Sequence, residues 1–290
     1  MGKRLNKWLL RVYAIGYRFI DKNECLMNNT NKKFKLIMPS KKYGYADPFV
    51  VHKDDKHYIF VEIMDKYTER GSIGVCCVED GCKVQEIIKE DFHMSYPNVF
   101  VWNNKYYMIP ETYQAKELRL YVAEEFPYKW KFEATLISGL ELVDFSFITD
   151  NEYLIGIAQD IENKRYKNRY FKINMNTFSG QEIFPDAEDA IDKRPGGNFF
   201  EHKGSMYLPM QECNKCYGEF LHVVQSQTLS EDKVVHVERK QIKANQISVN
   251  KLIAYDRIHT YNRSDDMEVI DIFLYKVSLK KVIKELIRGE

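Results

Sequence analysis

The sequence has almost no excess of charge of either sign. Its 43 lysines and arginines oppose 42 aspartates and glutamates, and the formal net charge is +1. Binding of a polyanion such as DNA depends on clustered positive charge and on the release of counterions, which this balance does not supply. We therefore expect no nucleic-acid partner.

Long hydrophobic runs are also missing. The first 20 residues mix apolar side chains with basic ones, and no uninterrupted apolar stretch is long enough for a secretory signal or a membrane span. The default expectation is a cytoplasmic protein. The basic, partly apolar segments 1–36 and 278–290 could still lie on the inner face of an anionic membrane, or they could pack against the outside of the main domain.

The six cysteines form no complete disulfide or metal framework. A chain of 290 residues buries enough surface to fold without disulfides, so we interpret Cys76 and Cys77 as reduced core residues. Cys213 and Cys216 have half of a zinc spacing, but no second CxxC or HxxxH pair accompanies them. We predict no metal site and no cofactor from these residues, although an acid-rich pocket could hold a calcium ion through oxygen ligands.

Nucleotide-binding glycine fingerprints are absent, and so is any long apolar period of 3.6 residues. The sequence therefore does not support a Rossmann-type donor site, a P-loop or a mainly helical fold. Aromatic residues are abundant instead, with 20 Tyr, 17 Phe and 3 Trp. They favour β-strands and also supply ring faces that stack on sugars, although packing between strands accounts for most of them.

One pattern recurs five times along the chain. An apolar strand opens on a polar or turn residue, a polar tip follows, and a second strand ends on an acid or an amide, always 15 positions after the opening residue. Successive openings lie 49, 48, 52 and 60 positions apart, which leaves room for one more pair of strands in each unit. The five predicted hairpins are Asp47–Glu62, Tyr96–Glu111, Asp144–Gln159, Gly196–Gln211 and Asp256–Asp271.

Units of this size are typical of the four-stranded blades of a β-propeller. We predict an all-β, five-bladed β-propeller over residues 37–277, with short helical or irregular extensions at residues 1–36 and 278–290. A β-sandwich or a barrel is the alternative, but a repeat of about 50 residues is unusual for either. The candidates for third and fourth strands are Gly71–Val75, Leu118–Val122, Gln85–Ile88 and Lys131–Leu136.

The repeat also predicts a site. In an antiparallel hairpin the first residue of one strand and the last residue of the next lie at the same end. If the first strand of each hairpin is the innermost of its blade, these ends surround the mouth of the central channel. The predicted ring contains Asp47, Glu62, Ser95, Tyr96, Glu111, Asp144, Gln159, Arg194, Gln211, His259 and Asp271.

Such a ring has the character of a sugar-binding pocket. Carboxylates and amides exchange several hydrogen bonds with hydroxyl groups, and Tyr96 or Tyr261 could add a ring face. Two carboxylates that face one pocket can also act as general acid and base on a glycosidic or phosphate-ester bond. A structural hydrogen bond repeated in every blade would produce the same pattern of acids and amides.

The segment Tyr45–Phe49, with the sequence YADPF, resembles the opening of the first blade in glycoside hydrolase family 43 and related five-bladed propellers. This resemblance implies that Asp47 matches their general base and that Asp144 matches the acid that orients and tunes the catalytic pair. The fourth blade departs from the pattern, because Arg194 stands where these hydrolases place a glutamate general acid. A guanidinium does not replace a carboxyl group as proton donor, so the resemblance does not carry their hydrolytic scheme over.

A second set of motifs extends over nearly the whole chain: Ala46–Phe49, Phe60–Glu62, Gly74–Val75, His93–Pro97, Ile109–Thr112, Arg194–Gly196, Gln211 and His259–Asn262. On these motifs the chain resembles the N-terminal propeller domain of the glucosamine inositolphosphorylceramide transferases of plants, and bacterial stand-alone relatives associated with surface-polysaccharide synthesis. The resemblance implies the propeller fold and a glycan context. The plant enzymes carry a separate glycosyltransferase-like C-terminal domain, which has no counterpart in these 290 residues.

Three functions are compatible with these observations. The leading hypothesis is a glycosyl-transferring enzyme of capsule, lipopolysaccharide or glycolipid synthesis that uses a nucleotide sugar or a sugar phosphate. Arg194 would bind the phosphate with two nitrogens, Asp47 would deprotonate the acceptor, and His259 or Glu111 would orient the sugar. Arg194 could instead pair with an acid of a neighbouring blade. The alternative functions are a glycoside hydrolase, with Asp47 and either Glu111 or Glu62 as its acid–base pair, and a non-catalytic glycan-binding module.

Overall fold

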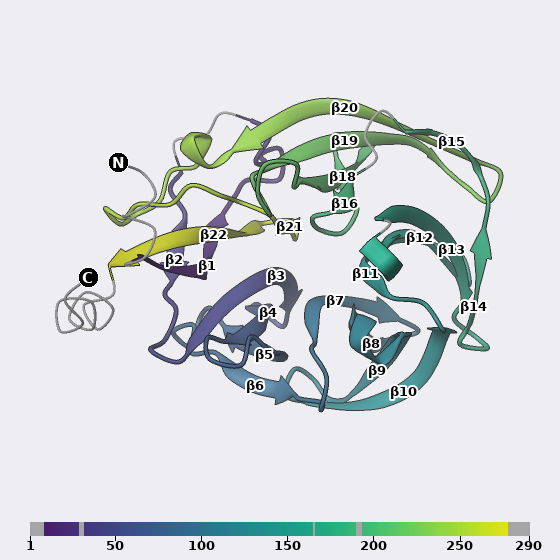
Figure 1. The fold of residues 1–290 in the computed structure, drawn as a ribbon, viewed down its shortest axis with the longest axis horizontal. Coiled ribbons are helices and arrows are strands. Elements are labelled where there is room, and N and C mark those ends of the chain that lie inside the picture. The colour runs from purple at the N-terminus through teal and green to yellow at the C-terminus, as the bar shows by residue number, and fades with distance from the viewer. Residues whose placement is uncertain (1–8, 29–31, 165, 190–192, 278–290) are drawn as a thin grey trace.

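The computed structural model describes residues 9–28, 32–164, 166–189 and 193–277. These residues form five β-sheets arranged around a central axis, which confirms the predicted five-bladed β-propeller (Figure 1). The inner strand of each sheet lies nearest the axis, and the other strands of the blade follow outward in the order of their pairing. The strand ends at one face of the disc therefore converge on the centre, as the sequence pattern requires.

The first three blades are four-stranded meanders. The first contains β3 (Tyr43–Lys53), β4 (Lys56–Asp65), β5 (Gly71–Cys77) and β6 (Gln85–Ile88). The second contains β7 (Ser95–Trp102), β8 (Lys105–Glu111), β9 (Glu117–Glu125) and β10 (Lys129–Ser138). The third contains β11 (Leu142–Asp150), β12 (Tyr153–Asp160), β13 (Lys167–Asn174) and β14 (Ser179–Ile183). The four predicted third and fourth strands lie within β5, β6, β9 and β10, and are confirmed.

The fourth blade has a divided inner strand and an added outer one. Both β16 and β17 pair with β18, so the predicted hairpin Gly196–Gln211 is present but its first strand is interrupted. On the outside, β15 pairs in parallel with β20. The blade contains β16 (Arg194–Pro195), β17 (Phe200–His202), β18 (Ser205–Glu212), β19 (Phe220–Leu229), β20 (Lys233–Lys243) and β15 (Asp186–Asp189).

The fifth blade combines strands from both ends of the chain. From the inside outward it contains β21 (Tyr261–Arg263), β22 (Met267–Val277), β1 (Leu9–Phe19) and β2 (Lys35–Ile37). All 11 residues of β1 pair with β22, which closes the ring (Figure 1). The prediction of a helical or irregular extension over residues 1–36, with a domain boundary at residue 37, is therefore wrong for these two strands.

The strand β1 was missed because its apolar and polar residues do not alternate. Val12, Ala14 and Ile15 are all buried, since the strand contacts the fourth blade on one face and the first blade on the other. Arg18, whose charge suggested an exposed segment, is buried and pairs with Glu268 of β22 at 2.5 Å. An interior strand that is covered on both faces thus has a composition that resembles a basic, amphipathic extension.

The fifth predicted hairpin, Asp256–Asp271, has the correct tip and an incorrect first strand. The tip lies at Ser264–Asp266, between β21 and β22, as predicted. Thr260 rather than Asp256 lies beside Asp271, whose N–H donates to the Thr260 carbonyl oxygen at 3.3 Å. The constant offset of 15 positions does not hold in this blade, because its inner strand is much shorter than those of the first three.

Hydrophobic clusters fill the spaces between neighbouring blades. Each of five clusters joins two adjacent sheets, so that every blade is held on both sides. Cys76 and Cys77 are buried in β5, as predicted, and the short 3₁₀ helices η1 (Tyr113–Ala115), η2 (Glu162–Lys164) and η3 (Ala244–Gln246) lie in the connections. This packing gives the inner strand ends a rigid frame.

The structure describes no helix that is both long and apolar enough to cross a membrane. Residues 1–8 and 278–290 lie outside the described residues. The predictions of membrane contact through the basic termini therefore stay predictions.

Candidate functional site

The same backbone irregularity occurs in the inner strands of the first three blades. Asp47, Tyr96 and Asp144 have φ angles of 49°, 48° and 54°, and each lies at a break in the register between the first two strands of its blade. Left-handed backbone is costly for residues other than glycine, and β-bulges often redirect side chains at functional sites. The repeated bulge is a local distortion that the fold maintains at the mouth of the channel.

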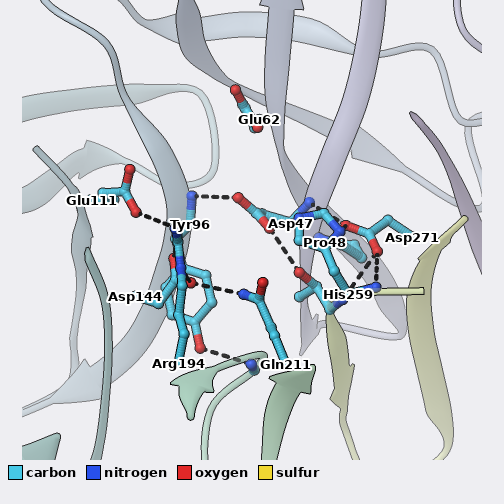
Figure 2. A network of polar contacts seen from close by, with 12 residues as sticks. Asp47, Pro48, Glu62, Tyr96, Glu111, Asp144, Arg194, Gln211, His259 and Asp271 are labelled. Atoms are coloured by element: carbon cyan, nitrogen blue, oxygen red, sulfur yellow. Dashed lines mark hydrogen bonds and ion pairs between the residues drawn. The ribbon is translucent and has the colours of Figure 1, made fainter. Parts of the chain in front are cut away.

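Eight polar residues meet at the centre of the disc, and we refer to them as the central cluster (Figure 2). They are Asp47, Glu62, Glu111, Asp144, Arg194, Gln211, His259 and Asp271. All eight belong to the ring that the hairpin repeat predicted, and they come from all five blades. The structure thus brings together strand ends that are far apart in the sequence.

His259 is sandwiched between two carboxylates. Its Nε2 lies 3.2 Å from Oδ1 of Asp47, and its Nδ1 lies 2.8 Å from Oδ2 of Asp271. Although burial alone would lower the pKa of His259, the charge of Asp271 and other neighbours raises this pKa well above its usual value. The imidazole is therefore a cation held between the first and fifth blades.

Asp271 organises the backbone around this cation. It accepts the backbone N–H of Asp47 at 3.1 Å, and those of His259 and Thr260 at 3.1 Å and 3.0 Å. Asp47 in turn accepts the Thr260 hydroxyl at 2.7 Å and the N–H of Tyr96 at 3.3 Å. Burial raises the pKa of Asp47, but the hydrogen bonds from His259 and Thr260 outweigh it, so that this pKa lies below its usual value. Asp47 is an ionised carboxylate at neutral pH.

Arg194 supplies the positive charge in the other half of the central cluster. Its Nε and Nη2 both contact the carboxylate of Asp144, and Nη2 also lies 3.0 Å from Oε2 of Glu111. Gln211 donates from Nε2 to Oδ2 of Asp144 at 2.8 Å and to the Pro195 carbonyl oxygen at 2.7 Å. The edge of the guanidinium that was expected to bind a phosphate is therefore occupied by Asp144. The inter-blade salt bridge considered as the alternative role of Arg194 is present, and binding of a phosphate by Arg194 stays a prediction.

Glu62 and Glu111 are the two carboxyl groups that retain a proton most readily. Burial is the largest cause that raises the pKa of each well above its usual value, and nearby Asp47 adds to the effect at both. Oε1 of Glu62 is buried without a hydrogen-bond partner, and Nε2 of His93, whose pKa burial lowers, lies 3.6 Å from it. In Figure 2 Glu62 stands apart from the network of dashed contacts. The cluster therefore contains an aspartate whose pKa is lowered beside two glutamates whose pKa values are raised.

A cavity of about 410 Å³ opens beside this cluster. Arg194 and Gln211 belong both to its lining and to the central cluster, so they connect the two. The remaining lining is polar and aromatic, which is typical of a site for a hydroxylated ligand. The lining residues are Gln159, Tyr166, Lys193, Arg194, Gln211, Cys213, Asn214 and Tyr217.

Tyr217, in the loop between β18 and β19, lies over the boundary between cavity and cluster. Its ring centroid is 5.2 Å from that of His259 and 5.7 Å from the guanidinium carbon of Arg194, yet 44% of the residue is exposed. Gly218 has φ +64°, and a Cβ at this position would come within 2.6 Å of the Cβ of His259. A residue with a Cβ at position 218 would clash with His259, so glycine is needed for this close approach of the loop. Tyr217, the preceding residue, lines the cavity.

Most of the propeller matches a family of known proteins. Residues 35–265 match the model of the family described as glucosamine inositolphosphorylceramide transferase 1, N-terminal. The chain belongs to this family. This confirms the resemblance expected from the sequence motifs, and the matched range contains every member of the central cluster except Asp271.

Two plant members of the family are 31% and 29% identical to this chain over 204 and 205 residues. They are the proteins named glucosamine inositolphosphorylceramide transferase 1 of Oryza sativa subsp. indica and of Arabidopsis thaliana, and the matches cover 66% and 67% of this chain. The matched part is 27% of the length of each relative, so the chain spans little more than one quarter of these proteins.

Several solved structures that this chain resembles in fold are glycoside hydrolases. The catalytic domain of the GH62 α-L-arabinofuranosidase of Coprinopsis cinerea superposes with a TM-score of 0.61 at 12% identity, covering 82% of this chain and 93% of that one. A GH43 β-xylosidase/α-arabinofuranosidase from a compost microbial metagenome gives a TM-score of 0.52 at 13% identity, covering 81% and 91%. At these identities the likeness concerns the fold alone.

Tyr96 and Tyr261, which were predicted to offer a ring face to a sugar, are both buried. Tyr96 is fully buried, and its hydroxyl contacts Ser146 and accepts the N–H of Gly197, each at 2.8 Å. Tyr261 is 0% exposed and donates to Glu268 at 2.8 Å within the hydrophobic core of the fifth blade. Ser95 is buried opposite Glu111 in the strand ladder. Tyr96 and Tyr261 therefore support the frame of the site and offer no surface to a sugar.

Four residues next to the central cluster were not predicted as site residues. Thr260 and His93 lie within the short motifs that carry the family resemblance, so those motifs could have pointed to them. Tyr13, on the missed strand β1, packs its ring 4.6 Å from that of His259, and Tyr217 covers the same ring from the loop. Neither tyrosine has a position within the hairpin repeat, and no sequence signal marks them.

Asp47, His259 and Asp271 could each offer one ligand atom to a metal ion. The raised pKa of His259 gives a different account of the same geometry, because an imidazolium already places a positive charge between the two carboxylates. Zinc requires a neutral imidazole, and the oxygens of Asp271 are engaged by three backbone N–H groups. The donor set therefore fits a protonated histidine better than a metal centre.

Glu62→Gln is expected to stabilise the protein increasingly as the pH rises above about 4.3, the usual pKa of an unfolded glutamate. The folded-state pKa of Glu62 is raised, so the folded protein binds more protons in the window above that value, and wild-type stability falls as the pH rises through it. Glutamine does not titrate, so the difference should grow by up to about 1.4 kcal/mol per pH unit until the folded-state pKa is reached. Urea unfolding of both proteins across this range measures it.

The exposed Glu133→Gln on β10 is the matched control and should show no such trend. A constant difference between Glu62→Gln and wild type at every pH would contradict the assignment of a raised pKa to Glu62.

Proposed function

We propose that the cavity binds a sugar of a glycan or glycolipid, and that this chain acts in glycosyl transfer during cell-surface glycan or glycolipid synthesis. The observation that carries this proposal is that Asp47, whose pKa is lowered, lies in one cluster with Glu111 and Glu62, whose pKa values are raised, beside a polar cavity. Carboxyl groups whose surroundings move their pKa values in opposite directions are suited to act as base and acid. The name of the plant relatives, which are transferases acting on a glycolipid, supports transfer as the reaction.

The proposed reaction needs two proton transfers, one to Asp47 and one from Glu111. Asp47 accepts the proton of the acceptor hydroxyl as its oxygen bonds to the anomeric carbon of the donor sugar. The bond from that carbon to the leaving oxygen breaks, and Glu111 protonates this oxygen. Arg194 contacts both Asp144 and Glu111, so it positions the acid and links it to the cavity wall. Thr260 and His259 hold Asp47 in its ionised form.

Access to Asp47 depends on the residues above it. Asp47 is only 4% exposed, whereas Tyr217 is 44% exposed. The ring of Tyr217 packs on the ring of His259, which is the ion-pair partner of Asp47. Movement of the Tyr217 side chain would open the cavity toward the cluster without disturbing the sheets. The ring would then stack on the bound sugar, which is the role expected earlier of Tyr96 or Tyr261.

The surroundings of Arg194 favour a neutral sugar over a phosphate group as the moiety in the cavity. Its Nε and Nη2 are engaged by Asp144 and Glu111, and Lys193, the other cation of the lining, pairs with Glu212 at 3.3 Å. A phosphate at this position would compete with these carboxylates for the two cations. Binding of a nucleotide sugar or a sugar phosphate is therefore an outcome to be tested and not part of the proposal.

Hydrolysis is the second candidate, with water in place of the acceptor hydroxyl. The specific observation in its favour is Glu62, whose Oε1 is buried without a hydrogen-bond partner and whose pKa is raised well above its usual value. A carboxyl group in that state can donate a proton without first breaking a salt bridge, unlike Glu111. Product analysis decides between the two, because hydrolysis releases a free reducing sugar and transfer does not.

Tyr217→Ala is expected to weaken binding of a sugar ligand about tenfold, since the loss of one stacked ring removes roughly 1 kcal/mol or slightly more. The measurement is isothermal titration of neutral oligosaccharides, nucleotide sugars and sugar phosphates into wild type and variant. Tyr67→Ala is the matched control, because Tyr67 is 80% exposed and lies outside the cavity lining. Equal affinities for Tyr217→Ala and wild type would contradict the placement of the sugar.

The Asp47→Asn variant separates an enzyme from a binding module in the same experiment. An enzyme that uses Asp47 as its base should keep its affinity and lose turnover by about 10²–10⁴-fold. A ligand that binds wild type and Asp47→Asn equally, with no product formed by either, would leave the site as a glycan-binding module.

A further inference from the structure

A second polar cluster lies at the opposite end of β3 from Asp47. His52 and His57 face each other across the first hairpin, next to its tip, and Asp266 reaches them from the tip between β21 and β22. Five residues of extended strand separate Asp47 from His52, a distance of roughly 17 Å, so this cluster is separate from the central cluster. It joins the first blade to the fifth, the two blades that meet where the ring closes.

The three side chains already have the spacing of metal ligands. Nε2 of His57 lies 3.0 Å from Oδ2 of Asp266, Nδ1 of His52 lies 3.8 Å from the same oxygen, and one donor atom from each residue lies within 4.8 Å of the other two. Ligands bound tetrahedrally to zinc at 2.0–2.2 Å are about 3.4 Å apart. The observed separations lie on both sides of this value, so small side-chain rotations would complete the geometry.

A carboxylate on the far side of His57 strengthens this interpretation. Nδ1 of His57 lies 2.8 Å from Oε1 of Glu79, while Nε2 faces Asp266. A neutral imidazole has one N–H, so with Nδ1–H donating to Glu79 the lone pair of Nε2 points at a carboxylate. That contact becomes favourable when a metal ion, or a second ring proton, lies between the two atoms. A ligating histidine whose other nitrogen donates to a carboxylate is also the usual second-sphere arrangement at metal sites.

We infer that His52, His57 and Asp266 bind a divalent transition-metal ion, zinc being the best match to two imidazole nitrogens and one carboxylate oxygen. His57 is nearly buried and is fixed by Glu79, whereas His52 and Asp266 are 41% and 42% exposed. The ion therefore has a rigid ligand on one side and an open path from solvent on the other. Water would complete its coordination.

The position of this site gives it a structural role. The ion would tie the first hairpin tip to the last one, and Phe19 at the end of β1 packs edge-on against His57 with ring centroids 5.1 Å apart. An ion that binds the folded protein and not the unfolded chain stabilises the closed ring by mass action. Zinc should therefore raise the unfolding temperature, and a chelator should reverse the rise.

The test is titration of Zn²⁺ and Co²⁺ into the full chain, without a histidine tag, in a Cys213→Ser/Cys216→Ser background that removes the two thiols of the CxxC pair. We expect one ion per chain, and a visible absorption band of bound Co²⁺ whose intensity indicates low coordination number. His52→Ala, which alters a half-exposed side chain, should weaken affinity at least about tenfold and abolish the band, and Glu79→Gln should weaken it about 10–100-fold. Asp265→Asn, next to Asp266 and exposed, is the matched control and should bind like the parent.

Two results would overturn the inference. If the parent binds neither ion at concentrations where it stays folded, His57 is only a structural contact between Glu79 and Asp266. If binding is present but equally strong in His52→Ala and Asp266→Asn, the ion lies elsewhere. Because His52 is exposed, loss of binding in its variant with an unchanged unfolding curve in chelator cannot come from misfolding.

Discussion

Deletion of residues 1–20 is expected to abolish cooperative folding of the remaining chain. The deletion removes β1, all 11 residues of which pair with β22, and it exposes both the fourth and the first blade where Val12, Ala14 and Ile15 pack. The loss comprises a whole strand ladder and two hydrophobic contacts, whereas the total stability of a domain is about 5–15 kcal/mol. Circular dichroism and urea unfolding of the truncated chain measure the effect.

The control is addition of a peptide of residues 1–20 to the truncated chain. If the fifth blade needs only the missing strand, the peptide should restore a cooperative transition at high concentration. A truncated chain that unfolds with the same midpoint and slope as the full chain would show that β1 does not hold the ring closed.

Arg194→Ala is expected to destabilise the protein by about 3–5 kcal/mol, because it removes the cation from a buried group of charges. Asp144 and Glu111 would remain buried without the guanidinium that contacts both, and Gln211 alone would bind Asp144. The effect should be largest at neutral pH. It should shrink as the pH falls, because the pKa values of Asp144 and Glu111 are already raised and rise further without Arg194, so that both carboxyls become neutral.

Lys129→Ala is the control, since Lys129 and its partner Glu125 are 66% and 65% exposed and exposed ion pairs contribute no more than about 1 kcal/mol. A second variant, Arg194→Met with Asp144→Asn, should recover part of the loss by removing one stranded charge. Urea unfolding at pH 5 and pH 8 would contradict the assignment if Arg194→Ala cost no more than Lys129→Ala at both values.

The hairpins could be predicted from sequence because each is a local structure. Asp47 and Glu62, like Tyr96 and Glu111, are brought together by a turn of a few residues, so strand patterns and turn residues contain the information. The fifth hairpin was misplaced because its inner strand is only three residues long and contributes little pattern. The composition of the central cluster followed from the same repeat, once inner strands were assumed to converge.

The chemistry of the site could not be predicted in the same way. That Arg194 pairs with Asp144 and Glu111 depends on contacts across 50 and 83 positions. That Tyr261 is in the core and Tyr217 at the cavity depends on which face of each element meets another blade. Residue type alone does not distinguish these roles.

The amino-acid sequence by itself determined the architecture of this protein and the membership of its polar ring, because both follow from short-range hairpins repeated five times. Only the tertiary structure decided how the ring closes, which residues cover it and which carboxyls hold a proton. Ring closure joins β1 to β22 across a separation of about 250 positions, as in the pairing of Arg18 with Glu268, and no local pattern encodes such a contact. Protonation depends on burial and on neighbouring charges, which exist only once the five blades have come together.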